Sequence, residues 1–156
     1  MIPKRIRPFF KTISTSTKRA TTLIEGNLTC CNSAEFEICV VGRIRHTIFS
    51  RMSLYHDTNR IVLYARCKQC GQIILVFDSD TDGYDACNQP QNKISSLTPI
   101  ACSKCLDNNY SVNIKYEYPD DLDETNIDNL FTWIWITLIC NDCGAKYNNF
   151  ISFETA

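Results

Sequence analysis

Six segments of the chain have the apolar pattern of strands, either alternation at every second position or a short run of β-branched and aromatic residues. The segments are Glu35–Val41, Ile61–Ala65 and Gln72–Phe77 in the first half, and Tyr110–Tyr116, Phe131–Leu138 and Lys146–Phe153 in the second. β-Branched and aromatic residues are enriched in them, and no segment of similar strength has the 3.6-residue period of a helix. The pattern predicts an all-β or β-rich protein.

The segment "FTWIWITL" is apolar on both faces, which is typical of a central strand covered on both sides. We therefore expect Trp133 and Trp135 to lie in the core. The surrounding apolar run, 130–140, is too short to span a bilayer as a helix, so we expect no membrane segment.

Two parts of the first half recur in the second at nearly one offset. "CNSAEFEICV" from Cys31 aligns with "CLDNNYSVNI" from Cys105 at an offset of 74, and "RCKQCGQIILV" from Arg66 aligns with "ICNDCGAKYNN" from Ile139 at 73. Two matches in the same order indicate an internal repeat. Each repeat is expected to form a small antiparallel sheet with a pair of cysteine turns.

Six of the ten cysteines form C-x-x-C pairs, and Gly71 and Gly144 follow two of these pairs. Two thiolates three residues apart on a tight turn point at one ion, and a glycine allows the backbone angle with which the turn ends. The turns "CKQCG" and "CNDCG" resemble the knuckles of zinc-ribbon or rubredoxin-type domains. This resemblance implies Zn²⁺ as the cofactor.

The second repeat has a complete set of four thiolates, Cys102, Cys105, Cys140 and Cys143. The 34 residues between its pairs exceed the usual 15–20, so a long hairpin must be inserted there. We predict one zinc ion in this repeat.

The first repeat offers Cys67, Cys70, Cys31 and Cys30, but its first turn, "LTCCN", is two residues shorter. Adjacent side chains of an extended chain point to opposite faces, so Cys30 can join Cys31 only if the backbone kinks. Otherwise the fourth ligand is Cys39, Cys87, His46 or His56, or the site is empty. A second zinc ion depends on this choice.

Charge divides the chain into a basic start and an acidic body. Residues 1–24 carry six basic residues and no acid, and the remaining residues carry ten basic and seventeen acidic ones. We expect 1–24 to be a flexible basic tail, 25–92 the first repeat and 97–156 the second. The tail also has the composition of a mitochondrial transit peptide, or of an arm that touches nucleic-acid phosphates.

The run "FDSDTDGYD" places Asp78, Asp80 and Asp82 at the alternate positions of a calcium loop. A strand-like segment precedes it, however, and position twelve is Gln89 in place of the bidentate Glu. We expect a solvated turn with Gly83 at positive φ, whose acidic residues could contact a partner.

No nucleophile–base arrangement, phosphate loop or H-x-E motif is present, so we expect a non-enzymatic protein. The favoured function is an intracellular, most simply cytoplasmic, interaction module that binds a protein partner as an inhibitor or adaptor. One alternative is a nucleic-acid-binding zinc ribbon, which the acidic body disfavours. The other is a C-x-x-C thiol redox protein.

Overall fold

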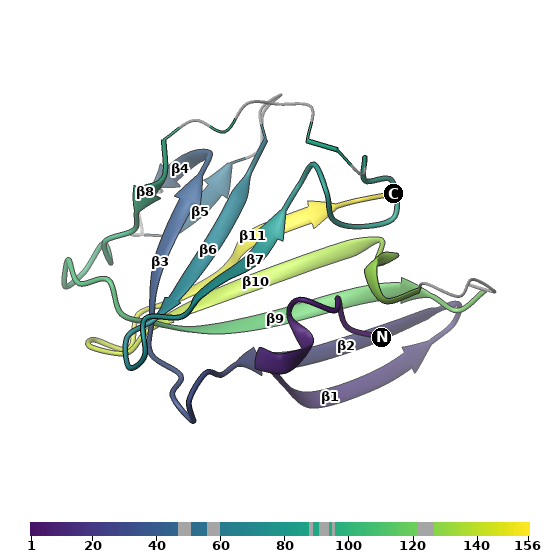
Figure 1. The fold of residues 1–156 in the computed structure, drawn as a ribbon, viewed down its shortest axis with the longest axis horizontal. Coiled ribbons are helices and arrows are strands. Elements are labelled where there is room, and N and C mark those ends of the chain that lie inside the picture. Colours follow the sequence, from purple (N-terminus) through teal and green to yellow (C-terminus); the bar gives the residue numbers. More distant parts are fainter. Residues whose placement is uncertain (47–50, 56–59, 88, 91–93, 95, 122–126) are drawn as a thin grey trace.

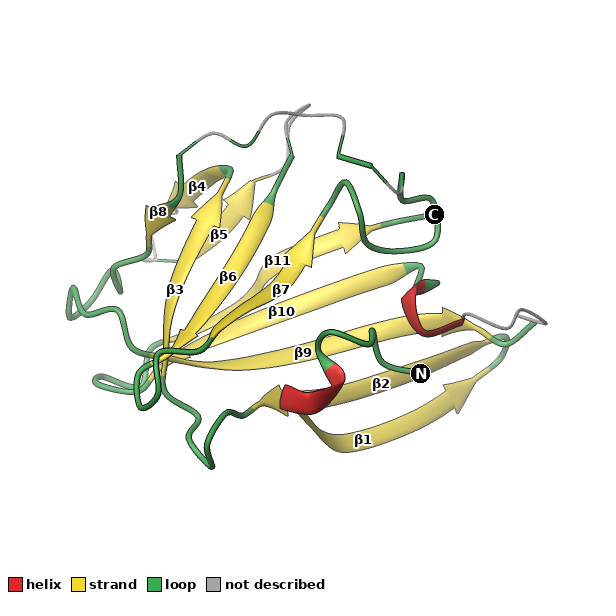
Figure 2. Cartoon of the chain, in the orientation of Figure 1, coloured by secondary structure: helices red, strands yellow, loops and turns green. Residues whose placement is uncertain are grey.

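The computed structural model describes the 156-residue chain except for 47–50, 56–59, 88, 91–93, 95 and 122–126. The described part consists of antiparallel strands and two short 3-10 helices, which confirms the predicted β-rich fold (Figure 2). The elements are η1 Arg7–Phe9, β1 Phe10–Lys18, β2 Thr21–Leu28, β3 Phe36–Val41, β4 Arg43–His46, β5 Met52–Tyr55, β6 Val62–Cys67, β7 Ile73–Asp78, β8 Thr98–Pro99, β9 Tyr110–Pro119, η2 Ile127–Asn129, β10 Trp133–Cys140 and β11 Lys146–Glu154.

The strands form two layers that fan apart from one corner (Figure 1). One layer has the order β1-β2-β9-β10-β11, and the other has the order β8-β3-β6-β7. The layers are joined where Phe36 of β3 pairs with Tyr110 of β9. The hairpin of β4 and β5 pairs separately, and β5 lies against β11.

The core lies between the two layers because strands such as β9 and β10 bury every second side chain. In β9 the residues from Tyr110 to Tyr118 alternate strictly between buried and half-buried, and β10 buries Ile134, Ile136 and Leu138 in the same way. These side chains and those of β3, β6 and β7 belong to one apolar cluster. Each large apolar side chain buried there contributes about 1.5–3 kcal/mol to folding.

All six predicted strands are present, each within three residues of its expected ends. The strand registers of the two halves also correspond at the offsets found in the sequence. Phe36 pairs with Cys67 in the first half, and Tyr110 pairs with Cys140 in the second. The pair Phe36–Tyr110 therefore joins two residues that the sequence alignment places at equivalent positions.

Residues 1–24 are not the expected flexible tail, because they form η1, β1 and the first part of β2. The side chain of Arg5 pairs with Asp82, and Arg7 donates to Asp128 at 2.6 Å. Strand β2 crosses the expected boundary at residue 25 and pairs with β9. The local composition was misleading because the acidic partners of these arginines lie far along the chain.

Trp133 and Trp135 lie half-buried on the outer face of the larger layer, so the expectation that they form part of the core is wrong. Residues of β10 alternate between the two faces, and the odd-numbered ones point outward whether or not they are apolar. The two rings stack with centroids 5.5 Å apart and an interplanar angle of 11°. The Nζ atom of Lys115 lies 5.5 Å from the Trp135 ring centroid, so these side chains cover one another.

Asp78 and Asp82 are buried, not solvated as expected. Asp78 accepts a hydrogen bond from Arg60 Nε at 2.8 Å, and Asp82 pairs with Arg5 and accepts from the Asp78 N–H at 2.8 Å. Both carboxylates are therefore committed to internal ion pairs and cannot form a contact surface for a partner. Gly83 has φ 95°, as expected for the turn.

Candidate metal centres

The eight cysteines predicted as ligands lie in two groups of four. One group is Cys30, Cys31, Cys67 and Cys70, and the other is Cys102, Cys105, Cys140 and Cys143. Within each group all four Sγ atoms lie within 4.8 Å of one another. Both groups can therefore hold a metal ion, and they are the two such groups in the part of the chain that the structure describes.

The three C-x-x-C turns share one backbone geometry. In each turn the N–H of the residue after the second cysteine donates to the carbonyl of the first cysteine, at 2.8–2.9 Å. That residue has positive φ in all three, 78° at Gly71, 67° at Leu106 and 74° at Gly144. The left-handed residue ends the turn and directs both thiols of the pair to the same side.

The fourth turn achieves the same result with two fewer residues. Cys30 and Ser33 form an antiparallel bridge with reciprocal N–H···O bonds of 2.9 and 2.8 Å. The central residues Cys31 and Asn32 both have positive φ, 54° and 59°, as a type I′ hairpin turn requires. This is the kink that adjacent cysteines need in order to point at one site.

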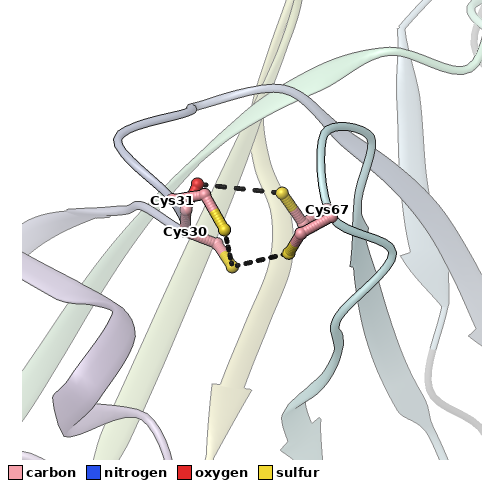
Figure 3. Close-up of side chains that lie close together, drawn as sticks. Cys30, Cys31 and Cys67 are labelled. Carbon is pink, nitrogen blue, oxygen red and sulfur yellow. Dashed lines mark hydrogen bonds between the residues drawn. The ribbon is translucent and has the colours of Figure 1, made fainter.

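Cys30 is thus a full member of the first group. Its Sγ lies 3.8 Å from that of Cys31 and 3.5 Å from that of Cys70. Figure 3 shows Cys30 and Cys31 on their turn facing Cys67 on the opposite one. Among the alternative ligands, Cys39, Cys87 and His46 lie in neither group, and His56 falls outside the described residues.

Four of the sulfur separations, two in each group, are close to those of tetrahedral coordination. Four sulfur atoms about 2.3 Å from a central zinc ion are about 3.8 Å apart. In the second group the Sγ atoms of Cys102 and Cys143 are 3.6 Å apart, and those of Cys105 and Cys140 are 3.5 Å apart. Four thiolates at this spacing complete the coordination shell, as structural zinc sites do.

Burial follows the order of the cysteines within each turn. The first cysteine of every turn (Cys30, Cys67, Cys102 and Cys140) is buried, and the second is exposed or half-exposed. The first cysteine ends or precedes a strand and takes part in the core, whereas the second projects from the turn. Each centre thus lies at the shared corner of the layers, with one side in the core.

Each group contains one thiol that ionises near neutral pH. A hydrogen bond from the Cys31 thiol is the main influence that lowers the pKa of Cys70 to about 7. Burial raises the pKa of Cys102, but hydrogen bonds from Tyr147 and from backbone N–H groups outweigh it and bring the pKa to about 6. Since the thiolate is the form that binds metal, Cys70 and Cys102 are the thiols at which ligation can begin at physiological pH, whereas burial and neighbouring thiols raise the pKa of Cys30 and Cys105.

Tyr147 supports the second centre, and sequence analysis did not identify it. Its Oη lies 3.1 Å from Cys102 Sγ and accepts a hydrogen bond from the Ser103 N–H at 3.0 Å. The equivalent residue of the first repeat is Ile74, which has no hydroxyl group. The difference between "CGAKY" and "CGQII" in the repeat alignment was the available signal.

Comparisons with protein family models, curated proteins and solved structures find no match to this chain. In the described residues, no helix has the length and apolar character needed to cross a bilayer.

Proposed function

We propose that the chain is a non-enzymatic zinc protein of two tandem zinc-ribbon-like repeats, and that it acts by binding another protein, as an inhibitor or adaptor. The observation that carries the proposal is the pair of four-cysteine groups, in each of which all Sγ atoms lie within 4.8 Å of one another. A four-thiolate zinc site has no open position for a substrate or water, so its contribution is to folding.

The corresponding registers of the two halves support the tandem arrangement. Each half presents a strand that begins after the first turn and pairs with the strand that leads into the second turn. A unit of about 70 residues buries little apolar surface alone, and a metal ion at the base of its strands compensates for this.

Redox chemistry is a weaker candidate because each C-x-x-C pair shares its surroundings with two further thiols. A catalytic dithiol commonly lies at a helix N-terminus, where the thiolate is stabilised and accessible. The helices of the described residues are the 3-10 turns η1 and η2, and neither begins at a cysteine.

Nucleic-acid binding is also less well supported, because several of the arginines that could contact phosphates are engaged with acids. Arg60 is buried against Asp78, and Arg66 donates to Glu37 at 3.1 Å. Arg5 and Arg7 of the basic start are paired as well.

Two measurements test the proposal. Elemental analysis of protein purified without added metal should give two zinc ions per chain, and less than half an equivalent would exclude structural zinc. The zinc-loaded chain should retain a protein partner from its source cells and should pass through a DNA column. Salt-sensitive retention on DNA, without a protein partner, would instead favour the nucleic-acid alternative.

A further inference from the structure

Exposed strand edges offer unpaired backbone groups, and most proteins cover them. Here the edge strand β7 is flanked by Arg5, whose side chain donates to the carbonyls of Leu75 (2.8 Å) and Val76 (3.4 Å). The edge of β3 is covered by β8, which contains a proline. Strand β11 has β5 against it.

Strand β1 differs from these edges. It pairs with β2 and with no other strand of the described chain, and it forms the outermost element of the larger layer (Figure 1). Eight of its nine residues are exposed. Between Lys11 and Lys18 the side chains are Ser, Thr and one Ile, with no proline. The two lysines discourage the pairing of uncharged or basic strands, so a strand that pairs here must carry acidic residues.

A bulge gives this edge a defined charge pattern. The register with β2 shifts between Thr12 and Ser14, so that Lys11 lies opposite Asn27 and Lys18 lies opposite Thr21. Asn27 and Thr21 are six residues apart, and an even separation puts them on one face of the sheet. Lys11 and Lys18 therefore both project from the outer face, one at each end of the edge.

These two lysines are the available positive charges of β1. Arg5 and Arg7 of the same basic segment are in ion pairs, whereas neither lysine forms one with any described residue. Opposite charges placed across neighbouring strands stabilise pairing, and like charges weaken it.

We propose that the free edge of β1 binds an extended, acidic segment of a partner protein as a sixth strand of the larger layer. The inference rests on the proposed interaction function and names the surface and chemistry of the partner. Backbone hydrogen bonds provide the contact, and acidic side chains six residues apart pair with Lys11 and Lys18. A second copy of this chain fits the edge less well, because it would bring further lysines and no acid to it.

The test uses the full zinc-loaded chain and a fluorescein-labelled nine-residue peptide of Thr and Val with Glu at positions two and eight. Fluorescence anisotropy at low salt should show saturable binding that the double variant Lys11→Glu/Lys18→Glu weakens at least tenfold. The matched variant Lys4→Glu/Lys146→Glu changes the net charge equally at exposed lysines outside β1 and should bind as the wild type does.

A peptide with N-methyl groups at alternate residues keeps the charges but cannot pair on one edge, so its binding should be lost. Equal binding of this peptide, or no effect of the β1 variant, would overturn the proposal. Light scattering that shows a dimer dissolved by Lys11→Glu/Lys18→Glu would assign the edge to a second copy and also overturn it. If a cellular partner is retained equally by wild type and β1 variant, the interaction function stands and only the edge assignment fails.

Discussion

The turn at Cys31 and Asn32 predicts that the first metal centre depends on a residue that binds no metal. Asn32 has φ 59°, and its side chain is exposed, so a substitution there changes the backbone preference without disturbing packing. Asn tolerates the left-handed region, whereas an ordinary L-residue is destabilised there by about 1–2 kcal/mol and a β-branched one by more. Asn32→Val should therefore destabilise the first centre by about 2 kcal/mol.

Because a factor of ten in affinity corresponds to about 1.4 kcal/mol, this change should weaken zinc binding at the first centre about 30-fold. Competition with a chromophoric chelator would resolve the two ions, and only one of them should become easier to remove. Asn32→Gly is the matched control and should retain both affinities, since glycine accepts positive φ. If Asn32→Val binds both zinc ions as the wild type does, the turn does not control the site.

Three further predictions concern the second centre and the buried ion pairs. Cys140→Ser removes a buried cysteine of the second group and should unfold the chain or halve its zinc content. Cys87→Ser should change the free energy of unfolding by no more than about 1 kcal/mol. Equal melting temperatures for the two variants would contradict this prediction. Tyr147→Phe removes the hydrogen bond to Cys102 and should raise the pKa of that thiol. The pH dependence of thiol alkylation in chelator-treated protein measures this pKa. The same alkylation profile in wild type and variant would contradict the prediction. Burial alone would raise the pKa of Asp78, but its hydrogen bonds from Arg60 and from a backbone N–H lower the pKa below its usual value. The ionised carboxylate therefore stabilises the fold above about pH 4, and this contribution is lost as the pH falls through the folded-state pKa. Asp78→Asn should reduce the fall in melting temperature between pH 5 and 2.

The sequence by itself determined six of the strands and seven of the eight cysteines that lie in the two groups. Both are encoded locally: alternation of apolar residues sets which face of a strand is buried, and C-x-x-C with a following glycine sets a turn. The repeat then related the two halves and grouped Cys31 with Cys67 and Cys70, but it left the place of Cys30 open. The confirmed elements, β3, β6, β7, β9, β10 and β11, are those whose pattern can be read within a few residues.

The tertiary structure alone decided how "LTCCN" contributes two ligands. The left-handed pair Cys31–Asn32 is costly for an isolated chain, and the Cys30–Ser33 bridge and the packing of Cys30 at the corner stabilise it. Asn32 tolerates positive φ, but nothing in the five residues requires the turn, and in an extended segment the adjacent thiols would diverge.

Ion pairs between residues far apart in the sequence likewise decided which charged side chains are buried. The basic start is ordered because Arg5 reaches Asp82 across 77 positions of sequence, and the same contact buries an acidic residue that looked solvated. A local window records the sign of each charge but not its partner. The oppositely charged residue determines whether a carboxylate lies in water or inside the protein, because a buried carboxylate is tolerated only when a cation neutralises it.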